Sequence, residues 1–456
     1  MSKNDIQMKT KQIPAVLFVL VALLFMQIEL DAQIGRRFLS ERKVVADPVS
    51  GQKLIFLTSK PVGDRKIYQT HNQWTSDGNW IVFSSNRVKG EALAVNEKTG
   101  EIVQVTEGGY AGMLNLSNKQ MKLYFIRNSD ENRDSKVIVE VDLAKVFADS
   151  KSGKMKPASI YQRICGVIPA DYQASGDMTL DADEEWAWFR VGKEKALRHL
   201  PAGTKIEPNF GPRNMGEGPG GIAGMNLKTG ELKYVVSTSF QIGHIQSNPW
   251  IPGQIVFCWE TGGKAPQRTW IVNTDGTGLR PLFPEASFDW VTHEAIISPD
   301  EVGIAILGHR KIKTEADSTS HKGTDPYGVN PGQEAGWGEC GTREKPTGFG
   351  VVNIKSREMK IIGQTDSGSG FWHVGGSSDM KFAVGDDFAR NIYLINRKTG
   401  EMMLLSAGHK ATAFDHPHPT FKADGTKIVI QSAMLSADNR SMNICVIPVP
   451  KKWLKK

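Results

Sequence analysis

The sequence predicts an all-β protein, a seven-bladed β-propeller, from three observations. The 456-residue chain contains 46 glycines and 11 tryptophans, a composition that suits a turn-rich β protein better than a helical one. A short phrase, consisting of a polar turn and then an alternating apolar strand, recurs seven times in constant phase. Each repeat unit spans roughly 50 residues, the size of a propeller blade, and no long helical periodicity interrupts the units.

The first repeated phrase contains a start residue, a turn resembling Ser-Pro-Asp-Gly, and then an alternating apolar strand. Typical copies read "HNQWTSDGNWIVFSS" and "HPTFKADGTKIVIQS". Self-similarity at a fixed period is the signature of a repeat architecture. The copies begin at His71, Met113, Asp177, His244, His293, His373 and His418.

A second phrase, two strands around a Lys-Thr-Gly-Glu turn or a relative of it, follows most copies. Examples are "LAVNEKTGEIVQVTEG", "GMNLKTGELKYVV" and "YLINRKTGEMMLLS". Thr-Gly and Asp-Gly turns favour tight hairpins, so each unit is expected to hold about four antiparallel strands. Two stacked β-sandwiches would not explain a repeat in constant phase.

The propeller domain is predicted to span residues 35–456. The segment 52–60, "QKLIFLTSK", is a candidate outer strand that closes the ring against the C-terminal "NICVIPV". Two insertions rich in glycine and proline, about 191–220 and 310–347, are expected to form loops over one face.

Residues 1–32 are predicted to be a secretory signal peptide. A polar start with three lysines precedes sixteen apolar residues, 13–28, and cleavage is expected after Ala32. The alternative is an uncleaved membrane anchor, for which the apolar run is short. We therefore expect a periplasmic or secreted protein without stable membrane insertion after cleavage.

The net charge bears on which partners the protein binds, and the cysteine spacing bears on zinc and redox sites. The formal net charge is +7, and the tail "KKWLKK" supplies four of these charges. A modest basic excess is compatible with an anionic substrate, and no nucleic-acid-binding module is recognisable. The four cysteines form no CxxC pair, so neither a zinc ribbon nor a redox pair is predicted.

Five of the ten histidines occupy one phase of the repeat. His71, His373 and His418 each stand six residues before the aspartate of their turn; His293 and His244 match this place within one residue. Equivalent positions of different blades lie at one end of a propeller, so these imidazoles are expected to converge there. Convergent histidines suit a metal or acid–base site, although any one of them could simply be a hydrogen-bonding residue at the start of a blade.

Two further features lie near this phase. His416 precedes His418 by two residues in "DHPHP", and alternate side chains of an extended chain share a side, so both could face one ion. Arg268 opens the strand in "QRTWIV", where it either faces the same channel or lies in solvent.

Several of these motifs together resemble the oligogalacturonate lyase family. They are "GHIQSNPWIPGQIVFCWE", "QRTWIVNTDGTGLR", "THEAIISPDE", "HVGGSSDMKFAVGDD" and "DHPHPTFKADG", in matching order and approximate spacing. The resemblance covers roughly residues 65–450 and implies a seven-bladed propeller. It also implies cleavage of an acidic uronate oligosaccharide by β-elimination with a divalent metal, typically manganese.

The resemblance assigns roles to individual residues. His373, His416 and His418 would bind the metal, His293 would remove the C5 proton, and Arg268 would match the family's active-site arginine. This chemistry is coherent, because a metal and an arginine at the uronate carboxylate stabilise the negative charge that develops when a neutral histidine takes the proton.

The chain departs from the family pattern at two positions. Ala413 stands where the family has a glutamine ligand, and Trp259 replaces the histidine of a "CHEG" motif. Trp259 could stack on a sugar, and His71 and His244 are held as substrate contacts. The best-known members of the family act inside the cell, whereas this chain is predicted to be exported.

Two other functions remain open from the sequence. A non-catalytic envelope propeller of the TolB type, binding a protein or a glycan, would share the repeats but would not need clustered histidines. A glycoside hydrolase on the same fold would need a carboxylate pair near the channel, for which the candidates are Glu260, Glu294, Asp386 and Asp387.

Overall fold

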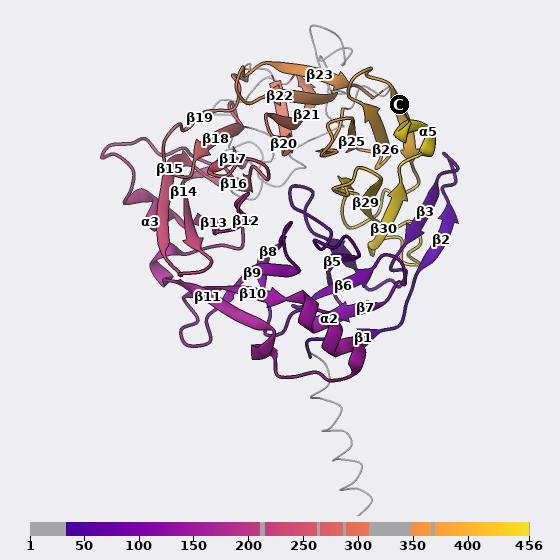
Figure 1. The fold of residues 1–456 in the computed structure, drawn as a ribbon. Helices are drawn as coiled ribbons and strands as arrows, with labels where there is room; N and C mark the ends of the chain where they lie inside the picture. The colour runs from indigo at the N-terminus through magenta and orange to yellow at the C-terminus, as the bar shows by residue number, and fades with distance from the viewer. Residues whose placement is uncertain are drawn as a thin grey trace, which may run out of the picture.

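The computed structural model describes residues 33–209, 215–261, 265–285, 289–309, 348–365 and 370–455. The predicted signal peptide and the predicted insertion at 310–347 lie outside these ranges. Within the described residues, seven β-sheets stand around a central axis (Figure 1), which confirms the predicted seven-bladed β-propeller.

Five blades each contain four consecutive antiparallel strands, which run from the axis outward in chain order (Figure 1). They are β8 (Ala111–Leu116), β9 (Lys122–Asn128), β10 (Lys136–Asp142) and β11 (Gln162–Ile168); β12 (Met178–Leu180), β13 (Trp186–Val191), β14 (Glu217–Asn226) and β15 (Leu232–Phe240); β16 (Ile242–Ser247), β17 (Gln254–Trp259), β18 (Thr269–Asn273) and β19 (Arg280–Pro281); β20 (Asp289–Ser298), β21 (Glu301–His309), β22 (Gly348–Asn353) and β23 (Met359–Gly363); β24 (His373–Gly376), β25 (Phe382–Asp386), β26 (Ile392–Asn396) and β27 (Met402–Ser406).

The other two blades have five strands because the N-terminal segment adds to both. One blade contains β4 (Asp64–Lys66), β5 (Trp80–Ser85), β6 (Ala92–Asn96), β7 (Ile102–Gln104) and β1 (Arg37–Phe38); the other contains β28 (Thr420–Phe421), β29 (Lys427–Ser432), β30 (Asn443–Pro448), β3 (Lys53–Phe56) and β2 (Lys43–Ala46).

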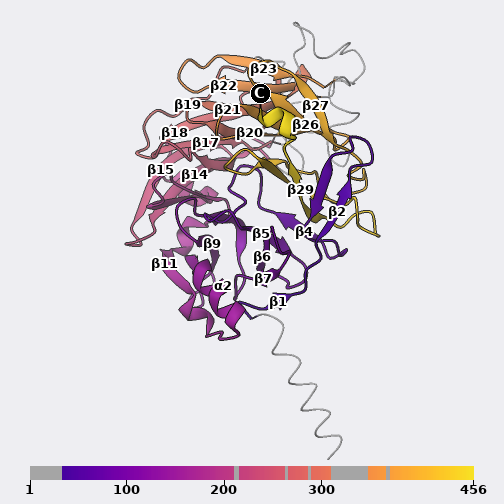
Figure 2. The same ribbon diagram turned by 45° about the vertical axis from the view of Figure 1, so that its right-hand side comes forward.

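The ring is closed by antiparallel pairing between the two ends of the chain. Ile55 and Phe56 of β3 pair with Val446 and Cys445 of β30, and β2 and β3 lie beside the C-terminal strands in both views (Figures 1 and 2). The predicted closing segment, 52–60, therefore takes the expected place.

The innermost strands begin at one end of the axis, which we call the entry end. Those of six blades line an axial cavity of ≈ 380 Å³ together with residues 69–72 of the remaining blade. The first repeated phrase thus contains the inner strand in six blades, as the phase of the repeat predicted; in the first blade the inner strand β4 lies before the phrase that begins at His71.

Apolar packing between blades follows the same repeat. Four successive second strands carry a fully buried phenylalanine at their fourth position: Phe83, Phe125, Phe189 and Phe257. In the hairpin turns of the Lys-Thr-Gly type, the glycine takes a positive φ of +73° to +76°, as at Gly100 and Gly400, a conformation that costs glycine little.

Helices are few in the described residues, and the longest was not predicted. Leu143–Ser152 (α2) follows β10; it begins at Asp142, whose side chain accepts from the Lys145 amide, and ends at Gly153 in the left-handed conformation. Local caps define this helix, not a long apolar period. The others are η1 (Ala158–Ile160), η2 (Ala170–Tyr172), α3 (Lys193–Leu197, within the predicted 191–220 insertion) and α5 (Lys451–Leu454).

Two features bear on redox chemistry and membranes. Cys165, Cys258 and Cys445 are buried free thiols. Among the described helices, none is long and apolar enough to cross a membrane.

Replacing Phe56 by alanine tests the closure. Phe56 lies in β3 with its side chain fully buried, so the cavity left behind is expected to lower the free energy of unfolding by about 3–5 kcal/mol. Urea denaturation measures the change. Leu39→Ala, at a side chain 86% exposed, is the control and should change stability by less than about 0.5 kcal/mol; equal effects of the two would contradict the closure model.

Candidate active site

Two inner strands are distorted at the histidines that the repeat singled out. The pairing of β16 with β17 shifts register around His244, and that of β20 with β21 shifts around His293. His244 and His418 also have positive φ, +50° and +51°. A bulge re-aims a side chain, and backbone strain in a non-glycine residue persists where the surroundings impose it. Both distortions direct imidazoles toward the axis.

Five imidazoles form a continuous cluster at the entry end. The ring centroid of His293 lies 5.7 Å from that of His244 and 4.4 Å from that of His373. His373 in turn lies 5.5 Å from His416 and 3.8 Å from His418. Four of the five histidines in the repeat phase therefore converge as expected, together with His416, whereas His71 is not part of the cluster.

Two aspartates hold the metal-candidate histidines. Asp386 lies opposite His373 in the β24–β25 ladder and accepts hydrogen bonds from the His373 amide at 2.8 Å and from its Nδ1 at 3.0 Å. Its other oxygen is 3.5 Å from Nδ1 of His416. Asp415 lies 3.2 Å from Nε2 of His418.

The protonation states of His373 and Asp386 suit metal binding. Burial and the neighbouring His418 lower the pKa of His373 to about 3, although Asp386 opposes the shift. Burial by itself would raise the pKa of Asp386, but His373 and His416 hold it below the ordinary value. A neutral imidazole beside an ionised carboxylate results at neutral pH, which is the state that a metal requires of its ligands.

The donor set fits a divalent metal. His373, Asp386 and His416 each offer a ligand atom, and these atoms lie within 4.8 Å of one another. Nδ1 of His416 is buried and makes no hydrogen bond among the described residues. Imidazole and carboxylate donors suit ions such as Mn²⁺, Fe²⁺ or Zn²⁺.

Ala413 does not contribute to this group. Its side chain is 7% exposed and packs in a small apolar cluster with Ala433 and Met442. The position where the resemblance would place a glutamine ligand therefore belongs to the core here.

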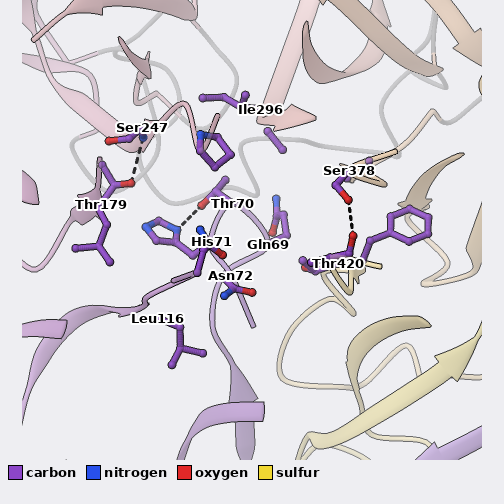
Figure 3. Close-up of a pocket in the computed structure, with 18 of the residues that line it drawn as sticks. Gln69, Thr70, His71, Asn72, Leu116, Thr179, Ser247, Ile296, Ser378 and Thr420 are labelled. Carbon is purple, nitrogen blue, oxygen red and sulfur yellow. Dashed lines mark hydrogen bonds between the residues drawn. The ribbon is translucent and has the colours of Figure 1, made fainter. Parts of the chain in front are cut away.

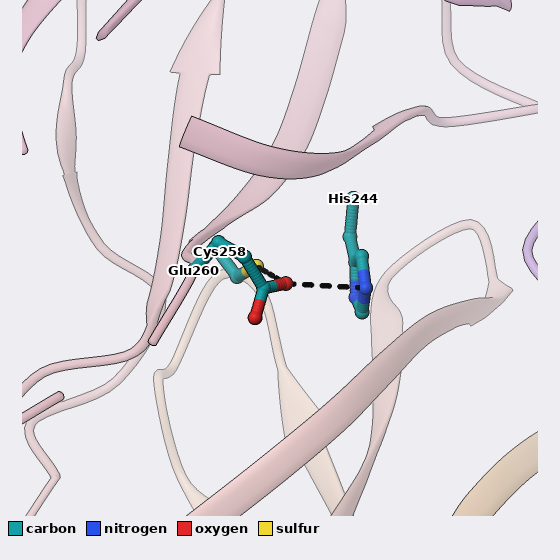
Figure 4. A group of neighbouring side chains, drawn as sticks. All are labelled: His244, Cys258 and Glu260. Carbon is teal, nitrogen blue, oxygen red and sulfur yellow. Dashed lines mark hydrogen bonds and ion pairs between the residues drawn. The ribbon is translucent and has the colours of Figure 1, made fainter. Parts of the chain in front are cut away.

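A second charged group lies beside His293, on the side away from the metal candidates. Glu294 is fully buried and bridges two cationic side chains: its Oε1 lies 2.9 Å from His244 Nδ1, and its Oε2 lies 3.1 Å from Arg268 Nε. Glu260 lies 3.3 Å from His244 Nε2 (Figure 4). Arg268 thus reaches the cluster, with a side chain only 2% exposed.

This group favours a charged His244 and a neutral His293. Burial alone would lower the pKa of His244, but Glu294 and Glu260 outweigh it and raise that pKa. Burial, with His373 and His244 nearby, holds the pKa of His293 well below its ordinary value. Adjacent imidazoles with opposite shifts are typical of acid–base sites.

His244, Cys258 and Glu260 also offer ligand atoms within 4.8 Å of one another (Figure 4). Arg268 lies next to them, with its Nη2 3.3 Å from His244 Nδ1 and 3.9 Å from Glu260. The buried guanidinium would repel a metal cation, so this group is better described as a salt-bridge network.

Tyr68 was not predicted and lies between the two groups. Its ring centroid is 5.3 Å from that of His244 and 5.1 Å from that of His418. It belongs to the segment that leaves β4 and enters the axis, which no repeat signal marks. Burial and the nearby Glu294 raise its pKa well above the ordinary value, so the phenol stays protonated.

His71 lies apart from the cluster, in the axial cavity (Figure 3). Its Nδ1 is 2.8 Å from Thr70 Oγ1, and its Nε2 is 2.9 Å from the Met178 carbonyl oxygen. Both nitrogens are therefore engaged: Nδ1 within the axial segment itself, and Nε2 with β12, two blades further along the chain.

Trp259 also lies where its side chain cannot contact a sugar. Its side chain is 5% exposed, its indole stacks on Phe240, and its Nε1 donates to the Gly216 carbonyl. Because the ring packs in the core, it presents no face to a sugar, contrary to what the sequence suggested.

The aromatic wall of the cluster comes from Trp372 instead. Its ring centroid lies 4.7 Å from that of His293, 4.8 Å from that of Phe388 and 6.0 Å from that of His416. Its position directly before His373 was the signal available in the sequence.

The carboxylates considered for a hydrolase are all engaged. Glu260 and Glu294 are held by the cationic network, Asp386 is held by His373, and Asp387 accepts from the amide and side chain of Asn391. No pair of these four is poised around an open site.

Fold and site define the class: a β-propeller with histidines and carboxylates gathered at one end of its axis. No protein-family model matches the sequence. The oligogalacturonate lyase of Dickeya dadantii (strain 3937) is 22% identical over 85% of this chain and 91% of its own length. The oligogalacturonide lyase of Pectobacterium atrosepticum is 23% identical over the same shares.

A solved structure of oligogalacturonate lyase in complex with manganese matches the fold, with a TM-score of 0.67 and 16% identity. It covers 92% of this chain and 99% of its own. The resemblance found in the sequence is thus confirmed, and the chain is a distant relative of the oligogalacturonate lyases.

Replacing Glu294 by glutamine tests the salt-bridge network. The change leaves Arg268 buried without its main anionic partner, so the free energy of unfolding should fall by about 3–5 kcal/mol. The pKa of His244 should also fall, because the carboxylate that raises it is gone. Urea denaturation and histidine NMR titration measure the two effects.

Glu101→Gln is the matched control, since Glu101 forms a half-exposed ion pair with Arg37 and should cost at most about 1 kcal/mol. Equal stability losses in the two variants would argue against the network.

Proposed function

We propose that this protein is a metal-dependent lyase that cleaves uronate-containing oligosaccharides by β-elimination, leaving 4,5-unsaturated products. The observation that carries the proposal is a half-buried His293 of lowered pKa that lies next to two differently organised groups: the metal-candidate residues around His373, and the Arg268–Glu294–His244 network. The names of the sequence relatives support the same chemistry.

His293 acts as the base. Its low pKa keeps the imidazole unprotonated, and its Nδ1 makes no hydrogen bond among the described residues. It takes the C5 proton of the uronate; the electrons of the C5–H bond form the C4–C5 double bond, and the C4–oxygen bond breaks with its electron pair on the oxygen, which takes a proton and leaves as a hydroxyl of the departing sugar. No water is consumed, which explains why a poised carboxylate pair is not needed.

Arg268 and the metal-candidate residues act on the uronate carboxylate. Arg268 contributes a fixed positive charge next to the base, held in place by Glu294. When bound at His373 and His416, a divalent metal, by analogy Mn²⁺, supplies the positive charge that polarises the carboxylate. The sequence adds His418 to that ligand set, and His244 provides a further cationic contact for the anionic substrate.

Trp372 forms a wall for the sugar. Its ring lies against both the base and His416. Amphipathic aromatic rings offer large rigid contact surfaces at binding sites, so this side chain fits one sugar face while the opposite polar groups contact the carboxylate.

We also propose that the protein is exported and that residues 1–32 are removed. Intact-mass measurement of protein recovered from the periplasm or medium should give a chain that begins at Gln33. Recovery of the full-length mass from the cytoplasm would contradict export, and full-length mass from the membrane fraction would indicate an uncleaved anchor.

His293→Ala tests the lyase directly. Loss of a positioned base should lower the rate of β-elimination about 10²–10⁴-fold, followed by ultraviolet absorbance of the unsaturated product on a panel of uronate oligosaccharides with Mn²⁺. Chelation of the metal should suppress the same absorbance.

The control is His199→Ala, since His199 stacks on Tyr234 outside the cluster and should leave the rate unchanged. If wild-type protein leaves every uronate untouched and yet binds a protein or glycan, the TolB-like binding function replaces the lyase.

A further inference from the structure

His418 is badly oriented to share a metal ion with His373. Their imidazoles stack with centroids 3.8 Å apart and planes inclined by 27°. A metal bonds a histidine nitrogen in the plane of its ring, at about 2.0–2.1 Å for zinc. Two rings stacked nearly face to face cannot both contain one ion in their planes at that distance.

His418 is instead held by other partners. Its Nε2 faces Asp415 at 3.2 Å, and the second oxygen of Asp415 accepts from Gln431 at 3.1 Å. The positive φ of His418 fixes this orientation from the backbone side. The arrangement binds the His416–His418 turn to β29.

Asp386 takes the place that His418 leaves. Its fully buried carboxylate reaches the imidazoles of both His373 and His416. The three residues offer ligand atoms within 4.8 Å of one another, a set that does not include His418. Burying a carboxylate is costly unless a positive charge or hydrogen bonds compensate, which a metal ion would do.

We propose that the divalent metal of this protein is bound by His373, His416 and Asp386, with His418 outside the coordination shell. This inference rests on the metal dependence in the proposed function, and it differs from the ligand set that the family resemblance implies. Asp386 adds an anionic ligand to a site whose expected glutamine position, Ala413, is closed by core packing.

A set of two histidines and one carboxylate leaves coordination positions open. Those positions can accept the carboxylate of a uronate together with water. Asp415 and His418 then act from outside, by fixing the turn that carries His416.

Direct metal binding tests the ligand set without reference to catalysis. The full mature chain, stripped with a chelator, is titrated with Mn²⁺ by electron paramagnetic resonance in the wild type, Asp386→Asn, His416→Gln and His418→Gln. We expect Asp386→Asn and His416→Gln to weaken Mn²⁺ binding by well over about 100-fold, and His418→Gln by no more than the roughly 10–100-fold typical of residues outside the coordination shell. A crystal structure with Mn²⁺ should show an Asp386 oxygen bonded to the ion.

His418→Gln losing Mn²⁺ while Asp386→Asn retains it would overturn the proposal, as would wild-type protein that binds no divalent metal. Asparagine keeps the oxygen that accepts from the His373 amide, so Asp386→Asn is expected to fold. Should it not, the comparison of His416→Gln with His418→Gln still decides. Protein that binds Mn²⁺ through this set but cleaves no uronate would contradict only the proposed function.

Discussion

Pairing of β3 with β30 is the interaction on which the rest of the structure depends. It joins the two ends of the chain in one blade and so closes seven sheets around an axis. The radial arrangement leaves only short, protected sheet edges, and closure brings the inner strands of the first and last blades together. Within the ring, β20, β24 and the turn before β28, from three successive blades, deliver histidines to the same point.

The convergence brings many charged and titratable side chains close together. They are arranged in two separate groups. On one side of His293, Glu294 and Glu260 balance Arg268 and a charged His244. On the other side, Asp386 lies beside His416 and beside His373, whose pKa burial lowers to about 3. Burial, followed by the nearby His373, His244 and Arg268, holds the pKa of His293 well below its ordinary value. Because the two groups differ in this way, the base and the residues that stabilise charge are separate side chains.

Much of the fold was predictable because the same pattern recurs along the chain, so an unclear signal in one copy is supported by the other copies. The phase of one turn placed six of the seven inner strands, and the same phase pointed to His293 and His373. Residues outside that phase escaped prediction: Tyr68 enters the axis on an irregular segment, and Trp372 was overlooked in favour of Trp259. The prediction for Trp259 was wrong because successive residues of a strand point to opposite faces of the sheet. Trp259 points to the face that packs against Phe240.

The sequence by itself determined the blade number, the closing strand and the end of the axis where the histidines gather, because each depends on a periodic pattern. Only the tertiary structure decided the partners of those histidines. Asp386 meets His373 through cross-strand pairing, and Glu294 meets Arg268 through contact between neighbouring blades. The "DHPHP" motif contains two histidines of equal standing in the sequence. Ring stacking and Asp415 separate them in space, because orientation is set by neighbours that the motif does not contain.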